Sequence, residues 1–115
     1  MRIDVKGRNV AVGDEIRERI EKRFQKIGRQ VSELAQLDVE LKEEKNPSIR
    51  ESCVAEATLH LKGVTLRARS AADNMQSAIN QMSDDLSRQV KRHRDKRRRR
   101  RETAKAAEAR PATSP

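Results

Sequence analysis

Residues 53–68 read CVAEATLHLKGVTLRA, and this stretch decides the fold. Apolar and polar residues alternate over 53–61, and the alternation resumes over 64–68. A period of two is typical of a β-strand that buries one face. Lys62 and Gly63, between the two runs, form a two-residue turn signal of the kind that joins hairpin strands. The stretch therefore predicts two antiparallel strands that bury the same face.

Two further segments with the same alternation precede the hairpin. Apolar residues alternate with polar ones over 1–6 and again over 37–41. Each segment predicts a half-buried strand. Between these strands and the hairpin, residues 43–52 contain Asn46-Pro47-Ser48 and predict a polar loop.

Two apolar stripes predict helices. Spacings of three and four residues place the members of each stripe on one helical face. We expect the first helix to start at Gly13 or Asp14 and to stop near Gly28, and the second to start with a capping box of Asp73 and Gln76. The first stripe is Ile16, Ile20, Phe24, Ile27 and Val31, and the second is Met75, Ile79, Met82, Leu86 and Val90.

The predicted order of elements is βαβββα. Two helices in this order cover one face of a four-stranded sheet, so the predicted class is α+β, like the double-stranded-RNA-binding domain. A chain of 115 residues has room for one compact domain. We expect this domain over residues 1–97, followed over 98–115 by a disordered tail that is first basic and then rich in Ala and Pro.

The net charge of +9 is a feature of the C-terminal part of the chain. Of the 27 basic and 18 acidic residues, ten basic residues and one acidic residue, Asp95, fall in 88–101, which leaves seventeen of each elsewhere. Such a cluster indicates a polyanionic partner. Because the second apolar stripe ends at Val90, we expect the basic residues beyond it either to project from the sheet as a basic spike or to fray into a basic arm. A disordered tail or a nuclear localisation signal is the alternative reading of residues 97–101.

The first helix carries a second group of basic residues beside its apolar stripe. At 100° per residue these side chains gather on one flank, while Asp14, Glu18 and Glu21 gather elsewhere. An ordinary solvated face is the alternative for this helix taken alone. We call the group the flank, and its members are Arg19, Lys22, Arg23, Lys26 and Arg29.

The residue types favour binding to phosphates over stacking on bases. The chain has no Trp and no Tyr, and its single aromatic residue, Phe24, belongs to the core stripe. Modules that read single strands stack bases on aromatic rings. Arg and Lys on helices instead predict recognition of structured RNA by charge and shape.

Catalytic and metal chemistry find no support in the sequence. Cys53 lies on the inward side of a strand, and His60 and His93 do not have the spacing of metal ligands. We therefore expect no enzyme, no cofactor, no metal and no small-molecule substrate. The sequence also lacks a signal peptide and an apolar run of about 18 residues, so we expect a cytoplasmic protein without membrane contact.

Four short segments carry a resemblance to a known family. They are IDVKGRNV at 3–10, LRA at 66–68, NMQSAI at 74–79 and LSRQVKRH at 86–93. In this order and spacing, over about residues 1–97, they resemble the ribosome hibernation-promoting factor family. The resemblance implies the βαβββα fold and binding to the small ribosomal subunit, in the channel for mRNA and tRNA, so that idle ribosomes are silenced.

The resemblance also implies that basic side chains on the helices contact the rRNA of the small subunit. Arg97, which opens the basic run, completes this set from the residue pattern. The predicted RNA-binding residues are Arg19, Lys22, Arg23, Lys26, Arg29, Arg88, Lys91, Arg92, Lys96 and Arg97.

The chain departs from the family pattern in two ways. Asn74-Met75-Gln76 stands where the family usually has Asp-Met-Tyr, which removes an aromatic ring. Long members also have a second domain that pairs ribosomes, and nothing after Arg101 resembles it, so pairing would need a missing domain or another factor. A short form and a truncated long form both remain open. The alternative functions are an interaction protein for an acidic partner or anionic surface, and a general structured-RNA binder.

Overall fold

The computed structural model describes residues 1–44 and 51–109, with side chains as far as Arg101. It confirms the predicted α+β class, the four strands and the 62–63 turn; most of the expected 43–52 loop lies outside the described residues. In chain order the elements are β1 (Arg2–Arg8), α1 (Asp14–Arg23), α2 (Gln25–Gln30), β2 (Gln36–Glu43), β3 (Cys53–Leu61), β4 (Val64–Ala72) and α3 (Met75–Ala109).

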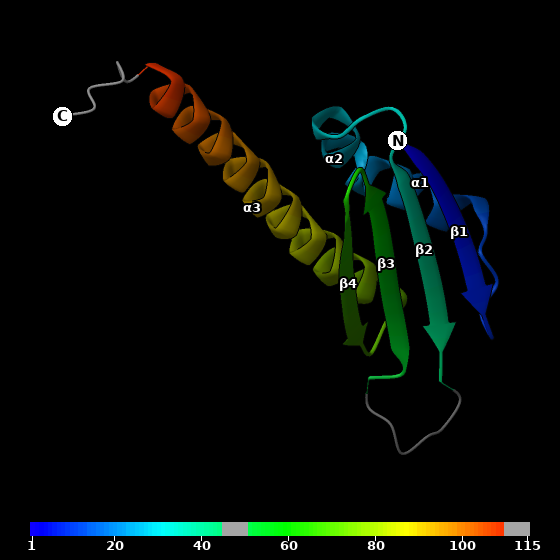
Figure 1. Cartoon of the computed structure of the whole chain (residues 1–115). Coiled ribbons are helices and arrows are strands. Elements are labelled where there is room, and N and C mark those ends of the chain that lie inside the picture. The colour runs from blue at the N-terminus through cyan, green and yellow to red at the C-terminus, as the bar shows by residue number, and fades with distance from the viewer. Residues whose placement is uncertain (45–50, 110–115) are drawn as a thin grey trace.

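The four strands form one sheet in the order β1-β2-β3-β4. β1 is parallel to β2, and the other pairs are antiparallel. Parallel neighbours need a crossover, which α1 and α2 supply. The register places Leu37 opposite Leu59 and Ala57 opposite Ala68, so the apolar residues of each strand meet on one face. All three helices lie on this face (Figure 1), and the other face is open.

The core lies between this face and the two predicted stripes. Ile20, Phe24 and Ile79 are fully buried. Met82 and Leu86 are buried with them, as predicted. The first residues of the stripes, Ile16 and Met75, are only half-buried and pack against the edge of this core.

The first predicted helix is two helices, because its geometry changes at Phe24. Phe24 has φ −97° and ψ 4°, its N–H still bonds to the Ile20 carbonyl at 3.0 Å, and its ring is fully buried. The prediction that the helix stops near Gly28 is wrong, because α2 continues to Gln30. A Cβ at Gly28 would lie 3.7 Å from Met1 Cε, an ordinary van der Waals contact, so the start of the chain lies close to α2.

The start of α3 also differs from the prediction. The capping residue is Asn74 and not Asp73: Asn74 Oδ1 accepts a hydrogen bond of 2.8 Å from the Ser77 backbone N–H. Ser77 is the third residue of the helix, where an Asn cap finds its donor. At the other helix, the expected start is confirmed, with Gly13 as the cap of α1.

α3 is much longer than the face that it covers. Among its described side chains the last fully buried one is Val90, and Gln89 Nε2 just before it donates a bond of 2.6 Å to the Arg67 carbonyl of β4. Beyond Val90 the helix leaves the sheet (Figure 1) and continues to Ala109. We call residues 91–101 the arm. The division at residue 97 into a domain and a tail stays a prediction; the helix runs across it, and residues 110–115 lie outside the described part.

Candidate nucleic-acid interface

The flank is carried by two helices instead of one. Arg19, Lys22 and Arg23 belong to α1, and Lys26 and Arg29 belong to α2. All five side chains are exposed. They are held in place from beneath, because Ile20, Phe24 and Ile27 of the same segment are buried in the core. The flank is therefore a set of exposed cations on a packed support.

Arg23 has a second role that the sequence did not reveal. Its Nη2 lies 3.6 Å from Asp84 Oδ1 and donates a bond of 3.4 Å to the Asn80 carbonyl. Both partners are on α3. The Arg23 side chain is 37% exposed, so it links two helices and still reaches solvent. It is the flank residue for which the structure shows an ion pair to α3.

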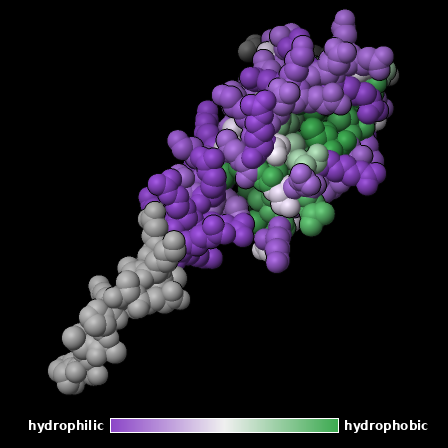
Figure 2. All heavy atoms as spheres, turned by 90° about the horizontal axis from the view of Figure 1, so that it is seen from above, coloured by the Kyte–Doolittle hydropathy of each residue, from purple (hydrophilic) through white to green (hydrophobic). Residues whose placement is uncertain are grey.

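The α3 part of the predicted set lies on both sides of Val90. Arg88 is exposed just before the last buried residue, while Lys91, Arg92, Lys96 and Arg97 are exposed on the arm. Flank and arm both belong to helices on the covered face of the sheet (Figure 1). Figure 2 shows hydrophilic residues gathered along α3 as it leaves the body. The structure thus places the predicted cations on the helical side of the molecule.

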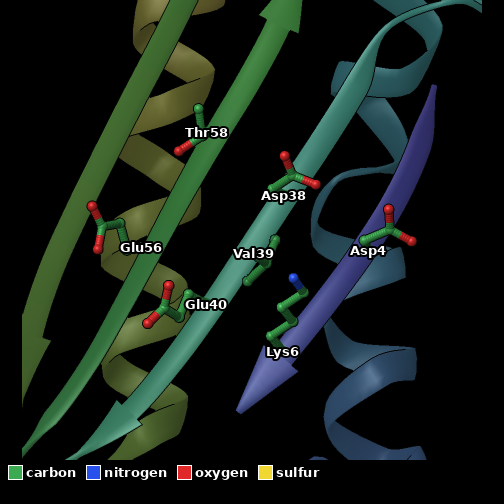
Figure 3. A pocket seen from close by; sticks show the side chains of 7 residues that line it. All are labelled: Asp4, Lys6, Asp38, Val39, Glu40, Glu56 and Thr58. Carbon is green, nitrogen blue, oxygen red and sulfur yellow. The ribbon is translucent and has the colours of Figure 1, made fainter. Parts of the chain in front are cut away.

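The open face of the sheet has the opposite charge at its centre. A hollow of about 270 Å³ lies there, and Figure 3 shows its side chains on β1, β2 and β3. We call it the acidic hollow. Its lining residues are Asp4, Lys6, Asp38, Val39, Glu40, Glu56 and Thr58.

Like charges stand side by side in the acidic hollow. The register pairs Asp4 with Asp38, and Glu40 with Glu56. Each acid also has a neighbour that can compensate its charge. Gln36 Nε2 donates to Asp4 at 2.8 Å and to Asp38 at 3.0 Å, and Arg8 Nε lies 2.9 Å from Glu40 Oε1. The register places Arg69 opposite Glu56. Directly opposed like charges destabilise a sheet and repel an approaching phosphate. The acidic hollow itself is therefore an unfavourable place for an RNA phosphate.

A second hollow lies where the 62–63 turn faces the arm, and the sequence did not reveal it. It is lined by basic residues from both elements. Of these, only Lys96 and Arg97 were in the predicted set. Lys62 was read as part of a turn signal, which says nothing about what faces it. Lys96 and Arg100 are four residues apart, which places them on one face of a helix, and this spacing was the one signal of the hollow in the sequence.

The described residues contain no group of three or more His, Cys, Asp or Glu side chains placed to hold a metal. Cys53 is buried, as predicted from its inward position on β3. His60 Nε2 lies 3.1 Å from Asp38 Oδ2 on the open face, far along the chain from His93 on the arm. No helix of the described part is long and apolar enough to span a bilayer.

Comparison with known families shows which family has this sequence. The family model described as "Sigma 54 modulation protein / S30EA ribosomal protein" matches residues 3–98, which include nearly all of β1, the other strands, and α3 as far as the middle of the basic run. The chain belongs to this family. The resemblance seen in the four short segments is thereby confirmed.

Several S30EA-family relatives are named as hibernation factors. The ribosome hibernation promoting factor of Salmonella typhimurium is 33% identical over 96 residues, which are 84% of this chain and 96% of that protein. The corresponding protein of Escherichia coli K12 is 31% identical with the same coverage. The ribosome hibernation promotion factor of a Picosynechococcus strain is 28% identical over 97 residues, and the chain spans about half (50%) of its length.

Two solved structures have the same fold. The N-terminal domain of Thermus thermophilus Protein Y aligns with a TM-score of 0.69 at 28% identity, over 81% of this chain and 99% of that one. A ribosomal subunit interface protein from Coxiella burnetii aligns with a TM-score of 0.70 over 83% of this chain and 99% of that one. At 19% identity, the second likeness shows the fold alone.

Proposed function

We propose that this protein binds rRNA of the small ribosomal subunit in the channel for mRNA and tRNA, and keeps idle ribosomes from translating. The observation that carries the proposal is the S30EA-family match over residues 3–98, which contains every flank residue and the arm as far as Arg98. The relatives named as ribosome hibernation factors support the same assignment. In this proposal the protein is a cytoplasmic binding protein and needs neither catalysis nor a cofactor.

The mechanism follows from the distribution of charge. Exposed Arg and Lys side chains on the flank and the arm neutralise rRNA phosphates, while the acidic hollow is an unfavourable place for them. A domain held in the channel by such contacts occupies the space that mRNA and tRNA need. We assign no described residue to the pairing of ribosomes, which would require a further domain or another factor.

The central test is chemical footprinting of rRNA in isolated small subunits. Lys22→Gln with Lys26→Gln removes two flank charges and leaves the Arg23–Asp84 link intact. We expect this variant to lose protection of the channel, because the flank sets the position of the domain. The matched control, Arg2→Gln with Lys6→Gln, removes two exposed charges from the open-face side of β1 and should keep the protection.

Salt dependence tests the phosphate mechanism separately. If six to ten phosphates are contacted, affinity for the small subunit should fall roughly 10³- to 10⁵-fold between about 50 and 200 mM monovalent salt. A nearly flat response would rule out a phosphate-driven interface. Protection of a different region of the subunit would refute the channel, and failure to sediment with subunits would refute ribosome binding.

The second candidate is a regulator that binds an acidic protein partner through the arm. The family description, which includes sigma 54 modulation, is the observation that favours it. Co-sedimentation before and after RNase treatment separates the two functions. Association that survives complete digestion of rRNA would support the protein partner.

A further inference from the structure

The hollow between the 62–63 turn and the arm has two walls of different origin. One wall is the turn that joins β3 and β4, and the other is one face of α3. The hollow measures about 590 Å³, within the range of roughly 300–1,000 Å³ that ligand pockets have. We call it the basic cleft. Its lining residues are Lys62, Gly63, Val64, His93, Lys96, Arg97 and Arg100.

The helical wall is a single row of nitrogen donors. Residues 93, 96, 97 and 100 are spaced by three, four and seven positions, which places them on one face of α3. The acid nearest in sequence, Asp95, lies about 100° to 160° around the helix from them, at about 100° per residue. With Lys62 on the other wall, four permanent cations face one space, and no acidic side chain is among its described lining residues.

Both walls are held by the fold. Lys62 stands on a turn closed by the Leu61–Val64 pair, in which Gly63 takes a φ of +79° that favours glycine. α3 is anchored just before the cleft, where Val90 is 2% exposed and Gln89 bonds to the Arg67 carbonyl. Groups that are already in position lose less entropy when they bind. The repulsion between the cations is then relieved by an anion that enters between them.

The shape of the surroundings indicates a chain of phosphates and not a lone ion. Lys62 and Arg97 also line an adjoining hollow of about 540 Å³, so both hollows meet at these two side chains. The second hollow contains Leu34, which is 94% exposed, together with Ala35 and Leu61. Figure 2 views this end of the molecule and shows hydrophobic residues exposed beside the hydrophilic ones of α3. A ligand that alternates phosphates with less polar groups matches a basic cleft that adjoins a partly hydrophobic hollow.

We propose that the basic cleft clamps the sugar–phosphate backbone of one rRNA segment, with phosphate between Lys62 and the Arg97 face of α3 and an adjacent sugar or base over Leu34. The proposal rests on the proposed function and adds a contact from the sheet side of the molecule. Lys62 makes the clamp two-sided. Without it, the arm would touch RNA from one side only, as any basic helix does.

The test compares lysines in affinity measurements on isolated small subunits across a salt series. Lys62→Gln and the control Lys6→Gln each remove one exposed charge, but Lys6 lines the acidic hollow. Loss of one phosphate contact should lower the slope of log affinity against log salt by about one, and weaken binding about 3- to 10-fold near physiological salt. Lys6→Gln should leave the slope unchanged.

The arm supplies a second matched pair. Arg100→Gln removes a cleft residue, and Arg94→Gln removes an exposed arginine that the cleft does not include. If the clamp exists, Arg100→Gln lowers the salt slope more than Arg94→Gln does, and Lys62→Gln lowers it more than Lys6→Gln does. Equal slopes within either pair would overturn the clamp. Pyrophosphate added at constant ionic strength should compete with the rRNA phosphate and narrow the difference between the variants. Binding of pyrophosphate to the free protein without any difference in slope on subunits would mean that the cleft takes a small polyphosphate and that the rRNA clamp is wrong. Absence of wild-type binding would instead overturn the proposed function.

Discussion

The flank and the arm have similar side chains but different supports. Beneath the flank, Ile20 and Phe24 are fully buried, so its cations stand on the core. The arm begins after the last core residue, Val90, and faces the 62–63 turn, but none of its described side chains is buried in the core. The difference shows that side chains of the same charge can have different roles in binding. A packed support fixes the geometry of a contact, while a projecting support extends the reach of the field.

The charge pattern of the two regions points the same way. The arm contains like charges four residues apart, such as Arg92 with Lys96 and Arg97 with Arg101, which weaken an isolated helix. The flank has an acidic partner in Asp84 and shares α1 with acidic residues. We infer that the arm attracts rRNA and that the flank sets the position in which the domain is held.

The largest expected effect comes from removing the support of the flank. Phe24→Ala should lower the free energy of unfolding by about 3–5 kcal/mol, because a fully buried ring is replaced by a cavity. Urea unfolding followed by circular dichroism measures it. Arg94→Gln on the arm is the control and should change stability by less than about 0.5 kcal/mol. Similar losses for the two variants would remove the distinction between the supports.

The next effect concerns the rate of association. Changing Arg97–Arg101 to Glu subtracts two charges at each of five positions, which takes the net charge from +9 to −1. Association with small subunits should slow about 10- to 10³-fold at low salt, because steering depends on the total field. Stopped-flow fluorescence measures the rate. At protein concentrations that restore occupancy, the footprint should stay in the channel; a displaced footprint would mean that the arm sets the position.

The smallest effect tests the link between the regions. Asp84→Asn weakens the Arg23–Asp84 pair, which is exposed enough that stability should change by less than about 1 kcal/mol. Affinity for the subunit should rise about two- to fivefold, since Arg23 becomes available to a phosphate. Asp95→Asn changes the net charge equally on the arm and is the matched control. Equal gains in equilibrium binding for both variants would argue against Arg23 as an rRNA contact.

Local periodicity made most of the fold predictable. The alternation over 53–61 and 64–68 predicted β3, β4 and the turn between them, and most residues of the helical stripes are buried as predicted. The break at Phe24 could not be predicted in this way. A wheel drawn at 100° per residue assumes one straight helix, whereas the backbone angles change at Phe24, whose ring is buried in the core.

The candidate site, like the fold, has features that the sequence predicts and features that it does not. Sequence position and charge identified the flank and the arm, because a run of cations outside an apolar stripe must be exposed. The role of Lys62 and the pairing of Arg23 with Asp84 could not be read in this way, since each joins residues that are far apart along the chain. No periodic pattern records which turn faces which helix.

The sequence by itself determined most of the elements and the buried faces, because these depend on residue types repeating every two or every three to four positions, and its composition determined the excess of positive charge. The tertiary structure decided what those elements face. It set β1 parallel to β2, gathered acids on the open face, and placed the 62–63 turn beside the arm. Such contacts arise only when distant segments pack on a common core, where burial of the apolar faces leaves few arrangements of the exposed charges.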